Sequence, residues 1–555
     1  MILRLLVAAV LAPVLVLPAK GAADPTPGDA AREPVRVFIF AGQSNMVGSD
    51  SKVRDIERFP PFAGLGEPQE KVRFQYCIGR EQKMRSDGWV ELEPVNGVVG
   101  PELSFAREVT GAIDAPIAII KCAAGGTHLG GDWNPVEPQG FELYPLALDH
   151  VQRALQALDE QRVRWRLEGF MWHQGENDMF NDAYRQAYGD NLLAYMARWR
   201  KDLGAPELRF YVGELCTKTI WGMDLRPRMY EIRVGQRAAT DADPLAQYVP
   251  NAHVGVEIGG GVGLHYHYGT LGQLEHGECY ADAYLRDVKA LPAAARPLSK
   301  WPYRPGAPVD LYVLAGHRNM EGERAFVQEL RDVDPKLGKQ LLRGVEGVAF
   351  RYDLGGGAKV SDGWEPMGAA GLFDTFGPEL SFAHALRAAK AKPFAVAKFT
   401  HSGSQVIDWT PAGSVAKSRN LYPRFLAFVK DAVQDLKRRG HRVRLRAVVY
   451  HLGENDMSWT PFRKEAARRL GQVAAKLRED LQMPKLRWIV SQQRPTDHED
   501  VNRVDPVAMV RELCAADPYM DHVEAFEPPP QPKQLVFDTA GVVWLGQLLA
   551  EAVQK

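Results

Sequence analysis

The feature that most constrains the fold of this chain is an internal repeat. Residues 37–46, VFIFAGQSNM, return as LYVLAGHRNM at 311–320. Three more motifs recur in the same order: SDGW at 86–89 and 361–364, GPELSFA at 100–106 and 377–383, and HQGENDM at 173–179 with HLGENDM at 451–457. Ordered recurrence at nearly constant spacing is the signature of a duplicated structural unit. The sequence therefore predicts one domain present twice in tandem.

The length of the chain agrees with this division. At 555 residues it is too long for one ordinary domain, and two domains of about 250 residues are the natural expectation. We place the first copy at 35–290 and the second at 309–555, joined by a Pro- and Ala-rich linker at 291–308.

The N-terminus has the pattern of a targeting segment. Arg4 precedes a short apolar stretch at 5–17, and small residues follow near residue 23. The stretch is shorter than the roughly 20 residues of a spanning helix. We expect a signal peptide at 1–23, a disordered lead-in at 24–34, and a secreted or periplasmic protein that leaves the membrane after cleavage. A membrane-tethered N-terminus is the alternative.

Apolar runs alternate with amphipathic stretches in each copy. In the first copy, nearly continuous apolar runs predict buried parallel strands at 35–41, 117–122, 167–173 and 208–213. Helices are expected at 101–113 and 182–203. This alternation predicts an α/β fold: two tandem three-layer α/β/α domains with parallel sheets.

Composition excludes some classes of partner. The 68 basic and 69 acidic residues nearly balance, which argues against nucleic acid or an anionic membrane as the main partner. Five cysteines are present without a CxxC pair, so neither a zinc ribbon nor a thioredoxin-type site is indicated. Disulfides and buried thiols both remain open, and the oligomeric state is not readable.

Ser44 is the first candidate for chemistry. It directly follows an apolar strand, so its hydroxyl is expected at the carboxyl edge of the sheet, where parallel sheets bind ligands. A serine there is a nucleophile if a histidine reaches its proton and donors surround the oxyanion. Taken alone, it is more often a helix N-cap.

Five motifs span nearly all of the first copy: Gly42-Gln-Ser-Asn-Met46, Gly100-Pro-Glu102, Lys121-Cys-Ala-Ala-Gly-Gly-Thr127, His173-Gln-Gly-Glu176 and Leu264-His-Tyr266. Together they resemble the SGNH hydrolases, most closely the sialate O-acetylesterase-like branch that also holds acetylxylan esterases of carbohydrate esterase family 6. The resemblance implies a flavodoxin-like fold, Ser44 as nucleophile and His265 as general base. It also implies an oxyanion hole made by the N–H groups of Ser44 and Gly100 with the side chain of Gln174. Acetylated carbohydrate would be the substrate, with no cofactor and no metal.

The acid of the expected triad is absent. Relatives commonly carry an aspartate three residues before the histidine, where this chain has Val262. Valine cannot accept the histidine's Nδ1–H, which the triad template requires. Either Glu257 substitutes, or a Ser–His dyad operates, or the domain does not hydrolyse. His267 competes with His265, although Gly-Leu-His-Tyr fits the family phrase better at His265.

The second copy serves as an internal control. Arg318 stands in place of Ser44, Leu452 in place of Gln174, and Val536 in place of His265. Arginine stays protonated and cannot be the nucleophile, so the second copy should be inert as a serine esterase. Residues that persist in both copies, Asp178 among them, are expected to bond neighbouring loops rather than act in chemistry.

Tryptophans leave a choice between sugar stacking and core packing. The residues concerned are Trp89, Trp133, Trp364, Trp409 and Trp459.

The favoured function is a secreted carbohydrate O-acetylesterase that forms an acyl-enzyme on Ser44. A non-catalytic glycan-binding pseudoenzyme and an esterase or thioesterase for another acyl group are the alternatives.

Overall fold

The computed structural model of the chain describes residues 33–216, 219–220, 223–251, 266–288, 298, 300–414, 420–457, 460–495, 504–530 and 536–555. The predicted signal peptide, nearly all of the lead-in and part of the linker therefore fall outside the described residues. Within the described ranges, no helix is both long and apolar enough to cross a membrane.

The first sheet has eight strands among the described residues, in the order β10-β7-β6-β1-β5-β2-β3, with β4 paired to β2. Its strands are β1 (Val35–Gly42), β2 (Gln69–Ile78), β3 (Met84–Arg85), β4 (Val90–Leu92), β5 (Ile117–Ala123), β6 (Trp165–His173), β7 (Phe210–Gly213) and β10 (Ala246–Val249). A separate hairpin joins β8 (Thr219–Ile220) and β9 (Met223–Asp224). The four predicted buried strands are confirmed as β1, β5, β6 and β7, which pair in parallel.

Helices cover both faces of this sheet. They are α1 (Ser44–Val47), η1 (Val53–Arg58), η2 (Pro60–Phe62), α2 (Glu102–Ala112), α3 (Leu143–Glu160), η3 (Asp178–Phe180), α4 (Asp182–Gln186), α5 (Tyr188–Asp202), α6 (Arg226–Ala242) and α7 (Gly269–Asp287). Apolar residues of α3, α5 and α6 form one core layer, and those of α2 and α7 form the other. Each layer covers one face of β1 because the side chains of a strand alternate between its two faces.

The second sheet repeats the first. Among the described residues it also has eight strands, in the order β13-β12-β15-β11-β16-β17-β18, with β14 paired to β12. The strands are β11 (Pro308–Gly316), β12 (Val345–Leu354), β13 (Lys359–Val360), β14 (Glu365–Met367), β15 (Phe394–Thr400), β16 (Arg442–Leu452), β17 (Arg487–Gln493) and β18 (Met520–Ala525). Read from β18, this order matches the first sheet strand for strand.

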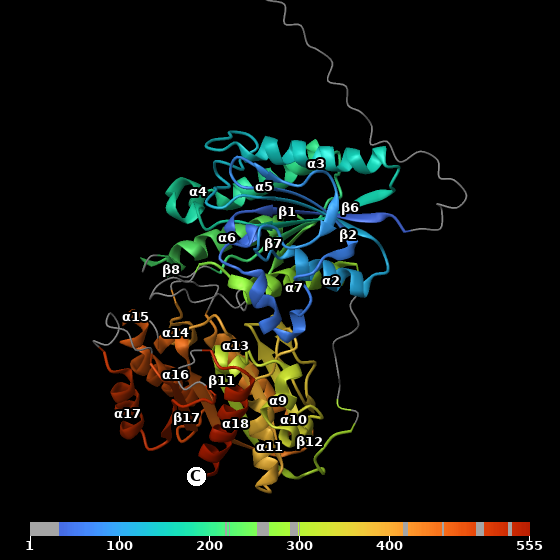
Figure 1. Cartoon of the computed structure of the whole chain (residues 1–555). Coiled ribbons are helices and arrows are strands. Elements are labelled where there is room, and N and C mark those ends of the chain that lie inside the picture. The colour runs from blue at the N-terminus through green and yellow to red at the C-terminus, as the bar shows by residue number, and fades with distance from the viewer. Residues whose placement is uncertain are drawn as a thin grey trace, which may run out of the picture.

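Helices again lie on both faces of the second sheet (Figure 1). They are α8 (Arg318–Glu321), η4 (Val327–Glu329), α9 (Leu330–Val333), α10 (Pro335–Leu341), α11 (Glu379–Ala388), α12 (Val406–Trp409), α13 (Tyr422–Arg438), α14 (Glu454–Met457), α15 (Thr460–Arg463), α16 (Ala466–Asp480), α17 (Pro506–Ala516) and α18 (Thr539–Gln554). The predicted class, two tandem α/β/α domains with mainly parallel sheets, is confirmed.

The duplication extends to an irregularity of the backbone. The pairing of β1 with β6 shifts register between Val37 and Phe38, and the pairing of β11 with β16 shifts between Leu311 and Tyr312. These two positions are equivalent in the repeat. Because a bulge is a defined local feature of a strand pair, its recurrence shows that the copies share detailed geometry as well as topology.

One predicted helix is wrong in detail. The stretch 182–203 forms two helices, α4 and α5, separated at Ala187, rather than one. Gly189 lies so close to α6 that an added Cβ would be 3.0 Å from the carbonyl oxygen of Gly235. This close approach of two backbones is a tertiary constraint, which the amphipathic pattern of the segment does not reveal.

The two copies contact each other through aromatic residues. Phe326 of the second copy packs into the α2/α7 core layer of the first, with its ring centroid 6.3 Å from that of Phe59. In Figure 1 the first copy lies above the second, and the two are in contact.

All five cysteines are buried thiols, and burial raises the pKa of Cys77 to about 12.

Candidate active site

Ser44 lies at the carboxyl edge of the first sheet, as predicted. The last residue of β1, Gly42, is in register with Ala123 at the end of β5 and His173 at the end of β6. A Cβ on Gly42 would lie 2.0 Å from the carbonyl oxygen of His173, and its φ is +152°. Only glycine lets the chain pass this close to β6 before it turns into α1.

The loop after β5 lies against Ser44. A Cβ added to Gly125 would be 3.6 Å from the Ser44 Cβ, so this loop meets the serine with the backbone of a glycine. Ser44 is half-buried, and its hydroxyl makes no hydrogen bond with any other residue that the structure describes. The hydroxyl is therefore not engaged as an N-cap by the described part of the chain.

Two backbone N–H groups beside this serine were predicted to bind an oxyanion. Within the described ranges, the N–H groups of Ser44 and Gly100 donate to no acceptor. In the second copy the N–H of Gly377, the equivalent of Gly100, donates to Oε1 of Glu379 at 3.0 Å. The first copy thus keeps a donor available where the second copy uses it internally.

The predicted third donor, Gln174, is fully buried. Its Nε2 lies 2.9 Å from the carbonyl oxygen of Thr127, 3.1 Å from Oε1 of Gln43 and 2.5 Å from Oδ2 of Asp178. These bonds hold the loop after β5 against the residue that precedes Ser44. The role of Gln174 in an oxyanion hole stays a prediction, and its observed bonds give it a positioning role.

Asp178 bonds to loop backbone, as expected. Its carboxylate accepts the N–H groups of Leu129 and Gly130 at 2.9 and 3.0 Å, and Asp456 in the second copy accepts the N–H of Val406. The prediction that this persistent aspartate bonds neighbouring loops is confirmed.

His265, Glu257 and Val262 lie outside the described residues, so their predicted roles stay predictions. The competing histidine, His267, is described. Its Nδ1 lies 2.6 Å from Oδ2 of Asp50, and its side chain is 18% exposed. Sequence reasoning did not find Asp50, because 217 residues separate it from His267.

The alignment of Val536 with His265 is wrong by two residues. In the first copy the N–H of Tyr268 donates to Oδ1 of Asn45, and in the second the N–H of Phe537 donates to Oδ1 of Asn319. Asn45 and Asn319 are equivalent, so Tyr268 matches Phe537. Val536 therefore matches His267.

A second histidine–aspartate pair lies in the loop after β5. His128 Nδ1 is 3.1 Å from Oδ2 of Asp132, and this hydrogen bond raises the pKa of His128. The spacing of four residues could have signalled the pair in the sequence. In the described part of the chain, no group of three or more His, Cys, Asp or Glu side chains is arranged to hold a metal.

The equivalent position in the second copy is filled. Arg318 is 2% exposed, and its Nε lies 3.1 Å from Oε2 of Glu323, which is equally buried. Leu452 and Val536 are also buried. A buried guanidinium paired with a carboxylate thus occupies the place of the serine and offers no nucleophile.

Most of the candidate tryptophans belong to the core. Trp133, Trp364 and Trp409 are buried, which confirms core packing for these three. Trp89 is half-buried and donates its Nε1–H to the carbonyl oxygen of Ala154 at 3.2 Å. Trp459 lies outside the described residues.

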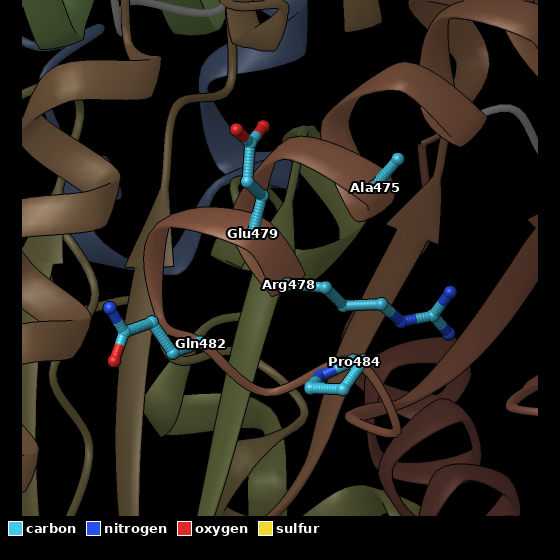
Figure 2. Close-up of a pocket in the computed structure, with 5 residues that line it drawn as sticks. All are labelled: Ala475, Arg478, Glu479, Gln482 and Pro484. Carbon is cyan, nitrogen blue, oxygen red and sulfur yellow. The ribbon is translucent and has the colours of Figure 1, made fainter.

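A surface pocket lies in the second copy, where α16 leads toward β17 (Figure 2). It is lined by Ala475, Arg478, Glu479, Gln482 and Pro484. Arg478 and Gln482 point in opposite directions, and Arg478 is bound to Asp517 and to the carbonyl oxygens of Leu486 and Tyr519. The lining side chains do not converge on a ligand, and none was a predicted site residue.

The shared strand order of the two copies matches an SGNH-like hydrolase fold, and the first copy alone carries a serine at the carboxyl edge of its first strand. The family of carbohydrate esterases described as sialic acid-specific acetylesterase matches residues 34–286 and 308–555. The chain belongs to this family. The match over two segments also agrees with the tandem duplication.

Each match to an individual relative spans slightly less than half of this chain. A probable carbohydrate esterase of Arabidopsis thaliana is 24% identical over 259 residues, which are 43% of this chain and 94% of the relative. The match to a solved structure of an Arabidopsis thaliana protein covers 46% of this chain and 99% of that protein, with 20% identity and a TM-score of 0.36. The match to a solved carbohydrate acetylesterase from Xanthomonas citri covers 48% of this chain and 59% of that protein, with 18% identity and a TM-score of 0.34.

Proposed function

We propose that the chain is a secreted carbohydrate O-acetylesterase whose first copy is active and whose second copy is not. The family supplies the reaction class and the acetylated sugar substrate. The observation that carries the proposal is the contrast at one position. Ser44 faces the bare backbone of Gly125, whereas its equivalent Arg318 is buried with Glu323.

In the proposed reaction, Ser44 Oγ attacks the acetyl carbonyl carbon, and a histidine from the stretch before α7 takes the hydroxyl proton. The motif resemblance assigns this role to His265. The N–H groups of Ser44 and Gly100 are the proposed donors to the oxyanion, where fixed dipoles lower the barrier without reorganising. Gln174, which the resemblance also assigns to the oxyanion hole, has to exchange one of its bonds to Gln43, Thr127 or Asp178 in order to donate there. The sugar alcohol leaves, and water then hydrolyses the acetyl-enzyme.

Secretion rests on the N-terminal pattern alone. The substituting acid Glu257 and a Ser–His dyad remain candidates for the gap left by Val262. The absence of an aspartate there also motivates a glycan-binding protein without activity as the second candidate function.

The test is hydrolysis of p-nitrophenyl acetate by the wild type and Ser44→Ala. We expect loss of activity by roughly 10⁴-fold or more in the variant. Equal rates would remove Ser44 from the reaction, and equal rates at the uncatalysed background would favour the glycan-binding alternative. Acetate release from acetylated xylan and O-acetyl sialic acid, compared with release of longer acyl chains, then distinguishes a sugar acetylesterase from an esterase or thioesterase for another acyl group.

A further inference from the structure

His267 and Asp50 form a polar pair that the proposed reaction has not used. Nδ1 of His267 lies 2.6 Å from Oδ2 of Asp50, a short distance typical of a charge-assisted hydrogen bond. When Nδ1 carries the proton and donates it to the carboxylate, Nε2 keeps its lone pair and can accept a proton. This is the tautomer that a general base requires.

The backbone on both sides of His267 is fixed beside Ser44. Asn45, the next residue after the serine, donates from Nδ2 to the carbonyl oxygen of Tyr266 at 3.0 Å. Its Oδ1 accepts the N–H of Tyr268 at 3.2 Å. One side chain adjacent to Ser44 therefore holds both neighbours of His267.

The segment that carries Asp50 is tied to the same place. The N–H of Lys52 donates to Oγ1 of Thr270 at 2.8 Å, and this hydroxyl lies 3.1 Å from the carbonyl oxygen of Lys52. Thr270 is the second residue of α7. Asp50 and His267 thus lie on two segments of the chain that are hydrogen-bonded to each other on both sides of the pair. Asn45 makes the bonds on one side, and Lys52 makes them on the other.

The second copy keeps these anchors without the pair. Phe537 bonds to Asn319, and the N–H of Phe326 donates to Oγ1 of Thr539 at 2.9 Å, as Lys52 does to Thr270. These matched bonds align Asp50 with Arg324 and His267 with Val536. The scaffold is retained while serine, histidine and aspartate are all replaced, which is the pattern expected if the three residues act together.

We infer that His267 is the general base of Ser44 and that Asp50 orients it, supplying the carboxylate that Val262 does not. This inference rests on the proposed function. His267 is the catalytic residue and Asp50 is a positioning residue. Ser44 Oγ is not hydrogen-bonded to His267 in this structure, as is common before substrate binds, because catalytic hydrogen bonds tighten in the complex.

The proton transfers balance over one turnover. Nε2 of His267 takes the Ser44 hydroxyl proton as Oγ bonds to the acetyl carbon. The imidazolium returns that proton to the sugar oxygen as the ester bond breaks and the alcohol leaves. In the second half, Nε2 takes a proton from water, whose oxygen bonds to the acetyl carbon. The proton then returns to Ser44 Oγ as acetic acid departs, and the acid releases its remaining proton to solvent as acetate.

The test compares variants of the full chain with p-nitrophenyl acetate, alongside labelling of Ser44 by a fluorophosphonate. His267→Asn should lower kcat by roughly 10²- to 10⁴-fold. The reduction in kcat caused by His265→Asn should be smaller than that by a factor of at least about ten. His384→Asn is the control, because it alters a surface histidine of the second copy whose Nε2 is bonded to Gln340, and its rate should be unchanged. The melting temperature of each variant checks its fold.

Asp50 is tested by two substitutions. Asp50→Asn should lower kcat and the labelling rate by roughly ten- to a hundredfold with KM unchanged, less than for a buried triad aspartate because Asp50 is largely exposed. Asp50→Glu should restore part of the loss, which a purely structural role would not require. Free imidazole should restore activity to His267→Ala, a response that only a folded site can give.

The outcomes separate the two proposals. If Ser44→Ala is inactive but His265→Asn loses as much as His267→Asn or more, His267 is not the base and the proposed function still stands. If Asp50→Asn keeps the wild-type kcat, the pair is only a surface contact. If Ser44→Ala is fully active, the proposed function itself fails.

Discussion

The backbone N–H of Tyr268 donates to Oδ1 of Asn45 at 3.2 Å, and this bond joins the end of the first copy to the residue beside the candidate nucleophile. The equivalent bond of Asn319 in the second copy serves no proposed chemistry. Substituting each asparagine in turn therefore distinguishes an effect on stability, expected in both copies, from an effect on activity, expected only in the first.

We predict that Asn45→Ala and Asn319→Ala each destabilise the fold by about 1–3 kcal/mol, since each leaves buried polar groups without their partner. Only Asn45→Ala should also lower kcat for p-nitrophenyl acetate, by roughly tenfold or more, because the histidine segment loses its anchor. Urea unfolding and steady-state kinetics measure the two effects. Equal kinetic losses in both variants would contradict this account.

Restoring a serine to the second copy should not restore activity. Arg318→Ser in a Ser44→Ala background is expected to remain at the background rate, because Val536 and Leu452 replace the base and the amide. The same change removes the arginine from the buried Glu323, at a cost of about 3–5 kcal/mol. Assaying the double variant checks the first expectation, and any serine-dependent hydrolysis would show that the second copy retains a working site.

A buried ion pair recurs in both copies and should matter equally in each. Lys121 lies 2.7 Å from Glu102, and Lys398 lies 2.8 Å from Glu379, all four being nearly inaccessible to solvent. Lys→Met at either position leaves a carboxylate unpaired in the core, and we expect a loss of about 3–5 kcal/mol in the free energy of unfolding. Denaturant titration measures it; a loss in one copy only would mean that the pairs are not equivalent.

The second copy should lose stability as pH rises from about 4.5 to about 7. Burial raises the pKa of Glu321 from 4.5 to about 7, so the folded state holds its proton over a range in which the unfolded chain has released it. The stabilisation is complete below about pH 4.5 and is lost as pH rises to about 7. Glu321→Gln should reduce this pH dependence by on the order of 2 kcal/mol between about pH 5 and pH 8. Thermal melts at both pH values test it, and identical slopes for wild type and variant would contradict it.

The fold was largely predictable because the repeat is long and the central strands are continuous apolar runs. The break at Ala187 was not, and the close approach of Gly189 to Gly235 two residues later is a tertiary contact that the local pattern does not show. The edge position of Ser44 followed from the strand before it. The match of Val536 to His267 required the Asn45 and Asn319 bonds, because sequence alone allows a shift of two residues there.

Asp50 was missed for a related reason. Its partner is distant in the chain, and hydrogen bonds of this kind leave no periodic pattern. A signal was nevertheless present: Arg324 stands at the equivalent position of the second copy, just as Arg318 stands at that of Ser44. Comparing the copies residue by residue around each motif would have marked Asp50 as a site that changes with the nucleophile.

The central claim is that Ser44 is an activated nucleophile and that the second copy contains none. The most direct measurement is mass spectrometry of the chain after reaction with a fluorophosphonate, which bonds covalently to activated serines. We predict one adduct per chain, on the peptide that contains Ser44, and no adduct on Ser44→Ala. An unlabelled wild type, or an adduct that persists in Ser44→Ala, would contradict the account.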